Sequence, residues 1–246
     1  MLSSEQVKRF TDEGFLALPE ALSSSAIVEV RNLLDPLFAS FSQLPPAHTR
    51  DLTGEGRAGS PRSAEIDRPL RLERRLQSTE AYRRCRELAQ HLGGRSARYS
   101  YDHAIYKAPF NNGETPWHQD HAYTGHRRLL RTMHFWIPLQ PATIENGCMQ
   151  FVAGSHVHGL LVHARDRDGH VRKTTVPDGT RRIACPLPVG GVTVHSPLTL
   201  HYTGANQTAD VRRAWILHFG PWGRLAKLHP GILLEKVAAR LTRQPA

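Results

Sequence analysis

Between Arg95 and Phe219 the chain is a succession of short apolar runs separated by turn residues, and this pattern limits the possible folds most. About eight runs have the length and composition of β-strands. They are ARYSYDHAIYKA, PWHQDHAY, RTMHFWIPL, CMQFVAG, RRIACPL, GGVTVHS, TLHYTG and RRAWILHF. Many short strands at moderate spacing predict a β-sandwich or a barrel.

The part of the chain before these runs has helical signals. Ser3 and Gln6 form a capping box that predicts a helix ending near Gly14. A strand over 15–18 and further helices over about 24–38 and 79–92 follow from their apolar spacing. Residues about 42–68 are poor in apolar groups and predict a long loop, of the kind that often forms a lid or binding loop. Helices gathered before an all-β region are expected to pack on one sheet.

The length of 246 residues suits one domain. We expect a helical part over about 1–94, a β core over about 95–222 and a C-terminal helix over about 224–243, a mainly β (α+β) arrangement. No apolar run is long enough to span a bilayer, and the first residues carry no secretory signal. The cytoplasm, with no membrane partner, is therefore the expected location.

The formal net charge of +10 raises the question of an anionic partner. Basic residues are mixed with acidic ones along the chain, so a nucleic-acid partner is not expected. The basic segment 163–182 is either a solvated loop or a flap that meets an acidic group of a substrate. The three cysteines, Cys85, Cys148 and Cys185, form no CxxC pair and are expected to be reduced, buried thiols.

The run His118-Gln119-Asp120 is the strongest candidate for chemistry. Residues i and i+2 of a strand project from the same face, so an imidazole and a carboxylate would point together into one cavity. A second imidazole from a distant strand completes the two-histidine, one-carboxylate ligand set of non-haem iron(II) oxygenases. His201, in TLHYTG, is the best candidate for it.

Several segments together resemble the phytanoyl-CoA dioxygenase family of 2-oxoglutarate oxygenases. FTDEGFLALPE, PWHQDHAY, ENGCMQFVAGSHVHG, GGVTVHSPLTLHYTGANQT and VRRAWILHF follow the order of the family's motifs, over about residues 5–222. The chain departs from the family pattern at Ala153 (usually proline), Gly191 (usually aspartate) and Thr203 (usually serine). The resemblance implies a double-stranded β-helix, a jelly-roll or cupin-like core, with the N-terminal helices packed outside it.

The resemblance also implies roles for individual residues. His118, Asp120 and His201 match the iron ligands, and Arg212 and Thr203 match the residues that bind the distal carboxylate of 2-oxoglutarate. Trp136 and His103 match positions near this cosubstrate. Neighbours on a strand point to opposite faces, so physical reasoning alone leaves Arg213 as a rival to Arg212; the family spacing favours Arg212.

The implied activity is that of a dioxygenase using Fe(II), 2-oxoglutarate and O2 to hydroxylate an unactivated C–H bond, releasing succinate and CO2. The expected partner is a small molecule, anionic or thioester-linked if the basic loops meet it, with secondary metabolism as one setting. Desaturation, epoxidation and cyclisation on the same iron remain alternatives, whereas Asp120 argues against halogenation. A non-enzymatic jelly-roll binding protein, a cupin-like enzyme without 2-oxoglutarate and a nucleic-acid oxygenase are the rival classes.

Overall fold

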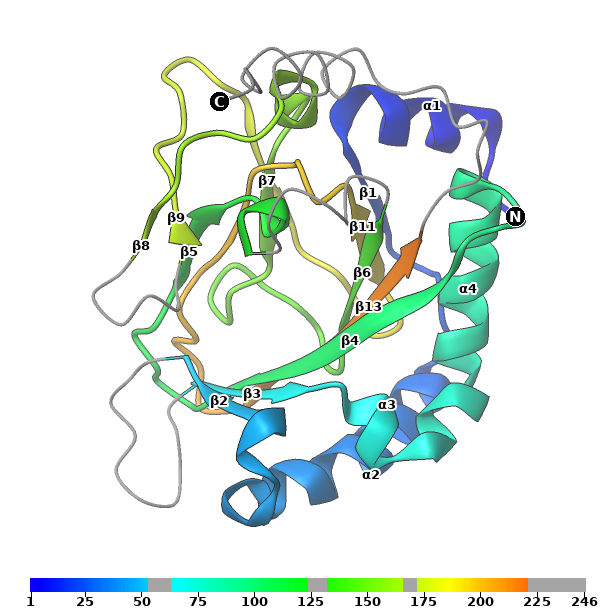
Figure 1. The fold of residues 1–246 in the computed structure, drawn as a ribbon, viewed down its shortest axis with the longest axis vertical. Coiled ribbons are helices and arrows are strands. Elements are labelled where there is room, and N and C mark those ends of the chain that lie inside the picture. The colour runs from blue at the N-terminus through cyan, green and yellow to red at the C-terminus, as the bar shows by residue number, and fades with distance from the viewer. Residues whose placement is uncertain (53–62, 124–131, 166–171, 221–246) are drawn as a thin grey trace, which may run out of the picture.

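The computed structural model describes residues 1–52, 63–123, 132–165 and 172–220. Two antiparallel sheets face each other, with helices on the outside of the larger one (Figure 1). The large sheet has the order β1-β11-β6-β13-β4-β3-β2 and the small sheet the order β10-β7-β12-β5. The rings of Phe15 in β1 and Phe151 in β7 stack 4.4 Å apart between the sheets. The expected jelly roll with helices on one sheet is confirmed.

The strands of the large sheet are β1 (Phe15–Leu18), β11 (Val192–His195), β6 (Met133–Pro138), β13 (Arg212–Gly220), β4 (Arg98–Lys107), β3 (Ser63–Asp67) and β2 (Thr49–Asp51). Those of the small sheet are β10 (Arg182–Cys185), β7 (Met149–Val152), β12 (His201–Thr203) and β5 (Thr115–His118), and β8 (Ala164–Arg165) pairs with β9 (Arg172–Lys173). The α-helices are α1 (Ser4–Glu13), α2 (Ser24–Ala39), α3 (Pro69–Leu72) and α4 (Glu80–Gly93). The 3-10 helices are η1 (Phe41–Gln43), η2 (Pro46–His48), η3 (Arg74–Ser78), η4 (Asp120–Tyr123) and η5 (Ser155–His158).

The N-terminal elements form as their sequence signals predict. Ser3 accepts a hydrogen bond from the backbone of Gln6 and Gln6 returns one, which completes the capping box of α1. Gly14 ends that helix at φ 80°, a conformation that glycine adopts without steric cost. A Cβ there would also lie 2.3 Å from His156 Nδ1, so this turn has no room for a side chain.

The expectation of a loop over about 42–68 is wrong at 49–51 and 63–67, where β2 and β3 form. β2 and β3 extend the large sheet beyond β4, with Glu65 paired to Ile105 and Asp67 to His103. These strands are polar because their side chains are matched by ionic partners: Glu65 contacts Arg50 and His103. Apolar periodicity therefore gives no signal for them. Residues 53–62 and the expected C-terminal helix 224–243 lie outside the described residues.

Alternation along the central strands separates two apolar layers. In β13, Trp215 and Leu217 face the helices and join the larger core, whereas Ala214 and Ile216 face the small sheet. In β6, Phe135 likewise faces the helices and Trp136 faces inward. The register of these strands therefore decides which polar side chains enter the space between the sheets.

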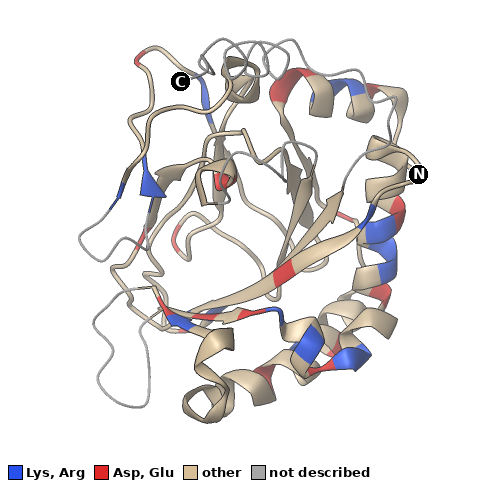
Figure 2. Cartoon of the chain, viewed as in Figure 1, with Lys and Arg blue, Asp and Glu red and all other residues tan. Residues whose placement is uncertain are grey.

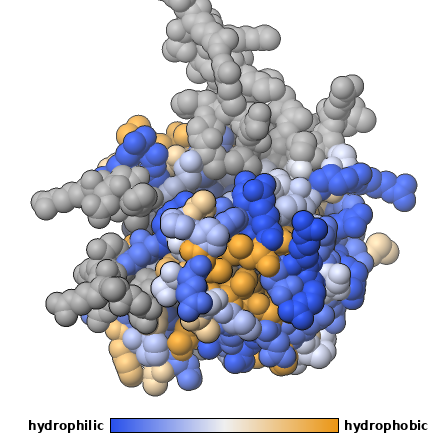
Figure 3. Space-filling model, turned by 60° about the horizontal axis from the view of Figure 1, so that its bottom comes forward, coloured by the Kyte–Doolittle hydropathy of each residue, from blue (hydrophilic) through white to orange (hydrophobic). Residues whose placement is uncertain are grey.

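The surface carries its charges in a mixed pattern. Blue and red residues alternate along the outer helices (Figure 2), with ion pairs such as Lys8–Asp12 and Arg84–Glu87. The lower face of the molecule shows apolar side chains gathered in its middle and bordered by hydrophilic ones (Figure 3). Among the described helices, none has the length and apolar character needed to cross a membrane. The three cysteines are free and buried, as expected.

Candidate functional site

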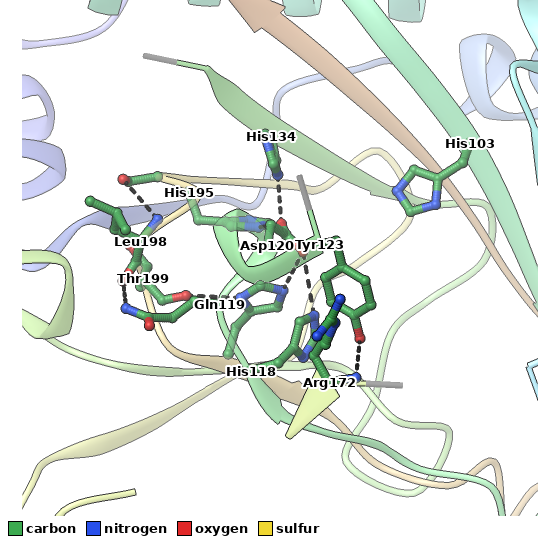
Figure 4. A network of polar contacts seen from close by, with 12 residues as sticks. His103, His118, Gln119, Asp120, Tyr123, His134, Arg172, His195, Leu198 and Thr199 are labelled. Atoms are coloured by element: carbon green, nitrogen blue, oxygen red, sulfur yellow. Dashed lines mark hydrogen bonds and ion pairs between the residues drawn. The ribbon is translucent and has the colours of Figure 1, made fainter. Parts of the chain in front are cut away.

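Three of the side chains singled out in the sequence meet between the sheets. His118 is the last residue of β5, Asp120 opens η4, and His201 is the first residue of β12. His201 and His118 are direct partners across the strand pair, so their rings lie together, with centroids 4.1 Å apart. Asp120 Oδ1 is 3.4 Å from Nε2 of His118 and 3.4 Å from Nε2 of His201 (Figure 4). The three groups could hold a metal ion.

The strand expected to carry both His118 and Asp120 ends at His118, two residues before Asp120. The chain leaves β5 after His118 and turns into η4, and the turn, rather than strand alternation, brings the carboxylate beside the imidazole. Gln119 fixes this turn because its buried amide donates to the carbonyls of Gly159 and Leu198, at 2.8 and 2.6 Å, and accepts from Leu161 N at 2.8 Å. Sequence reasoning missed this anchor.

The two imidazoles are oriented through their outer nitrogens. His118 Nδ1 lies 2.7 Å from the carbonyl oxygen of Pro116, and His201 Nδ1 lies 2.9 Å from that of Thr199. A carbonyl only accepts, so each Nδ1 carries the proton and each Nε2 presents a lone pair toward Asp120. A hydrogen bond to a backbone carbonyl on the far nitrogen is the usual support for a histidine that binds metal.

The spacing of the ligand atoms also suits an ion. Donors that bind one metal at about 2.0–2.2 Å in open angular positions are separated by roughly 3 Å or more. The two 3.4 Å separations meet this condition and exceed the length of an N–H···O hydrogen bond. Two imidazoles with one carboxylate are the ligand types that non-haem iron(II) sites use. The residues present therefore fit a divalent iron.

The second oxygen of Asp120 meets two further histidines. His134 Nδ1 lies 2.5 Å and His195 Nε2 lies 3.1 Å from Oδ2. Asp120, His134 and His195 form a second group with the geometry to hold a metal, but 2.5 Å is too short for two ligands of one ion and suits a hydrogen bond. Neither histidine has a role that the sequence predicts, although His134 precedes the inward-facing Trp136 by two residues and so shares its face.

Burial and neighbouring rings determine the charges in this cluster. Burial lowers the pKa of His118, His134 and His195. Burial alone would raise the pKa of Asp120, but the facing imidazoles of His201, His134 and His118 hold it well below its usual range. These directions favour neutral rings at His118, His134 and His195 and an ionised Asp120, and metal binding requires deprotonated ligands.

The two candidate arginines point to opposite faces of β13, as the alternation of side chains along a strand requires. Arg212 is 2% exposed and points inward, with its guanidinium carbon 5.8 Å from the centre of the Trp136 ring. Its Nε and Nη1 find no hydrogen-bond partner among the described residues. Burial lowers the pKa of Arg212 to about 10, which leaves it cationic at neutral pH. Arg213 points outward and donates from Nε to Asp35 at 3.0 Å.

The remaining predicted residues lie on the same inner surface. Thr203 is buried on β12, two residues after His201. His103 on β4 stands apart from the Asp120 cluster (Figure 4) and pairs with Glu65 at 2.7 Å. Burial alone would lower the pKa of His103, but Glu65 raises it. His103 is therefore engaged by a carboxylate of the protein.

Comparison with known proteins identifies a family and a curated relative. A model of phytanoyl-CoA dioxygenase (PhyH) matches residues 10–214. Phytanoyl-CoA dioxygenase domain-containing protein 1 of Mus musculus is 30% identical over 121 residues, which are 46% of this chain and 42% of that protein. The matched part thus spans less than half the length of this curated relative.

Solved structures extend the likeness over nearly the whole chain. EvdO2 from Micromonospora carbonacea var. aurantiaca, complexed with 2-oxoglutarate, superposes with a TM-score of 0.77 and 31% identity, covering 94% of this chain and 96% of that one. The epimerase SnoN, in complex with Fe3+, alpha ketoglutarate and nogalamycin RO, shares the fold at 22% identity and a TM-score of 0.70, covering 87% and 82%. With the family model spanning both sheets and all three candidate ligands, the chain belongs to the phytanoyl-CoA dioxygenase (PhyH) family.

Proposed function

We propose that the protein is an Fe(II)- and 2-oxoglutarate-dependent dioxygenase that hydroxylates an unactivated C–H bond of a small molecule and releases succinate and CO2. The observation that carries this proposal is the convergence of two lone-pair-bearing Nε2 atoms on one oxygen of Asp120 in a buried site. The likeness to EvdO2, which was solved with 2-oxoglutarate, supports the choice of cosubstrate.

His118, Asp120 and His201 hold the iron in this proposal. When bound, iron with 2-oxoglutarate supplies the oxidising power for the C–H bond. The protein contributes orientation: the carbonyls of Pro116 and Thr199 fix the two rings, and Gln119 fixes the turn that carries Asp120. Because all three ligands are kept, halogenation, which needs the carboxylate position vacant, is not proposed.

Arg212 and Thr203 bind the distal carboxylate of 2-oxoglutarate. A guanidinium meets a carboxylate with two parallel hydrogen bonds, and Arg212 has donors that no described residue uses. The Trp136 ring packs beside the guanidinium and shields it from water. His103 lies on the inner surface farther along β4. It is paired with Glu65 and lines the wall of the site.

An anaerobic titration of the metal-free protein with Fe(II) and 2-oxoglutarate tests this proposal. We expect the weak visible charge-transfer band of the iron–2-oxoglutarate chelate with the unmodified protein, a weaker band with Arg212→Ala and no band with His118→Ala. A folded protein that gives no band would contradict the proposal and favour the binding-protein alternative. Product analysis then separates hydroxylation from desaturation, epoxidation or cyclisation once a substrate is found.

A further inference from the structure

The inner surface of the large sheet has a polar part that the proposed chemistry has not used. Glu65 on β3 is the register partner of Ile105, which packs between the sheets. His103 on β4 is the partner of Ile216 in the same layer, and His218 follows Ile216 by two residues. The three polar side chains therefore point between the sheets and form a polar wall, defined as Glu65, His103 and His218.

Glu65 fixes the orientation of His103. Its Oε1 lies 2.7 Å from His103 Nδ1, and its Oε2 accepts a hydrogen bond from Arg50 Nη1 at 2.9 Å. The carboxylate accepts, so Nδ1 donates and Nε2 is left at the other edge of the ring. Nε2 has no hydrogen-bond partner among the described residues, and 19% of the side chain is exposed. Figure 4 shows this ring pointing from β4 toward the Asp120 cluster, so Nε2 is available to a ligand there.

His218 connects the polar wall to the metal ligands. Its ring lies edge-on to that of His103, with centroids 5.4 Å apart, and stacks on that of His134 at 3.6 Å. His134 in turn contacts Asp120 at 2.5 Å. His218 Nε2 is buried and has no hydrogen-bond partner within the described part of the chain. A buried polar atom without a partner is costly, so its position close to the metal ligands indicates a polar group of a ligand.

Tyr123 adds an aromatic surface close to the polar wall. Its ring lies edge-on to that of His118, with centroids 5.6 Å apart, and the residue is 43% exposed. Burial raises the pKa of Tyr123 to about 12, and the carboxylates of Asp120 and Glu65 add to the shift, so the phenol is within electrostatic reach of both. In Figure 4 it stands on the His103 side of the Asp120 cluster. The C–H face of a saturated ring can pack on this surface while its polar edge meets the imidazoles.

We propose that the polar wall binds the substrate through hydroxyl groups, and that the substrate is an uncharged polyol or sugar ring with a hydroxyl on His103 Nε2. This inference rests on the proposed function and names its substrate class. A hydroxyl both donates and accepts, so it fits an imidazole nitrogen in either protonation state. An anion is disfavoured because Glu65 is itself a carboxylate and the positive charge of Arg50 is already paired with it. A hydrocarbon chain would leave the imidazoles without partners.

Anaerobic titrations of the protein loaded with Fe(II) and 2-oxoglutarate test this proposal. The uncharged probes are inositol and the methyl glycosides of glucose, galactose and mannose. The corresponding methyl uronides are the matched anions, and tetrahydropyran is the ring without hydroxyl groups. A molecule held beside the metal perturbs the charge-transfer band of the chelate, which reports its binding. We expect at least one uncharged hydroxylated ring to bind, its uronide to bind roughly tenfold more weakly or worse, and tetrahydropyran to leave the band unchanged.

Variants of His103 separate binding of the substrate from binding of the cosubstrate. His103→Phe keeps an aromatic ring without hydrogen-bonding atoms and should weaken the tightest probe roughly tenfold, with the affinity for 2-oxoglutarate unchanged. A merely structural role would change both affinities. His103→Gln places an amide near the former Nε2 and should recover part of the probe binding. His158→Ala, at an exposed position, is the control and should match the unmodified protein.

Three results would overturn the proposal. One is a protein that forms the band but binds no hydroxylated probe, and another is equal binding of the uronides or of tetrahydropyran. The third is a His103→Phe variant that binds the tightest probe as the unmodified protein does. If thermal unfolding shows that this variant is not folded, His218→Phe, which removes Nε2 and keeps a ring beside His134, provides the same comparison. Absence of the band in the unmodified protein would instead contradict the proposed function.

Discussion

Arg212 and Arg213 are adjacent in the chain but belong to different layers of the molecule. Arg212 lies between the two sheets beside Trp136, whereas Arg213 faces the helices and contacts Asp35 and the ring of Tyr106. The strand pairing of β13 with β4 and β6 fixes this division, because a shift by one residue would exchange the two side chains. The structure thus separates two residues that the sequence left as rivals.

We expect Arg212→Ala and Arg213→Ala to have opposite profiles. Arg212→Ala should weaken 2-oxoglutarate binding by roughly tenfold or more, since it removes a charge-assisted contact. Arg213→Ala should leave that affinity unchanged and lower the free energy of unfolding by up to about 1 kcal/mol, because its partner Asp35 is partly exposed. Calorimetry and urea denaturation measure the two effects; a reversed outcome would assign the cosubstrate to Arg213.

His134 and His195 should control how firmly Asp120 holds a metal. Removal of a group that orients a metal ligand typically costs tenfold to a hundredfold in affinity, and we expect roughly that loss for His134→Ala. His134→Asn places an amide near the former Nδ1, and His195→Gln places one near the former Nε2, so each should recover part of the affinity. Competition against a chromophoric chelator measures it. Exposed His158→Ala is the control, and equal affinities throughout would contradict the positioning role.

Gln119→Ala should destabilise the whole site rather than one ligand. The substitution leaves the N–H of Leu161 and the two buried carbonyls of Gly159 and Leu198 without their partner. We expect the free energy of unfolding to fall by about 1–3 kcal/mol, together with weaker metal binding. Urea denaturation followed by far-UV circular dichroism gives the first quantity. Stability equal to that of the unmodified protein would show that Gln119 does not anchor the turn.

The cysteines should resist alkylation in the folded protein. Burial raises the pKa of Cys185 to about 12, and it also raises the pKa of Cys85 and Cys148. The reactive thiolate is therefore scarce at pH 8, and reagent access is blocked as well. Iodoacetamide should modify none of the three in the folded state and all three in denaturant, as read by intact mass. Rapid labelling of the native protein would contradict this.

Much of the architecture follows from local sequence signals. The Ser3–Gln6 box, Gly14 and the alternating runs from Arg95 onward predict α1, its end and most of the strands, because each signal acts within a few residues. These signals do not predict β3, because its stabilising partners, Arg50 and His103, are distant in sequence. The sequence does not reveal the roles of His134 and His195 for the same reason: these roles depend on which strands become neighbours, and no short window contains that information.

β5 has four residues and lies at the edge of the small sheet, with β12 as its partner in the sheet. Its last residue, His118, faces His201 across that pair. An ion bound by both histidines would tie the edge strand β5 to β12. It would close the loop of chain between them, as a covalent cross-link does. Removal of the ion with a chelator should then speed amide hydrogen exchange at residues 115–118. It should also expose strand edges that can pair with other chains. The metal-free protein is thus expected to be the form most prone to aggregate.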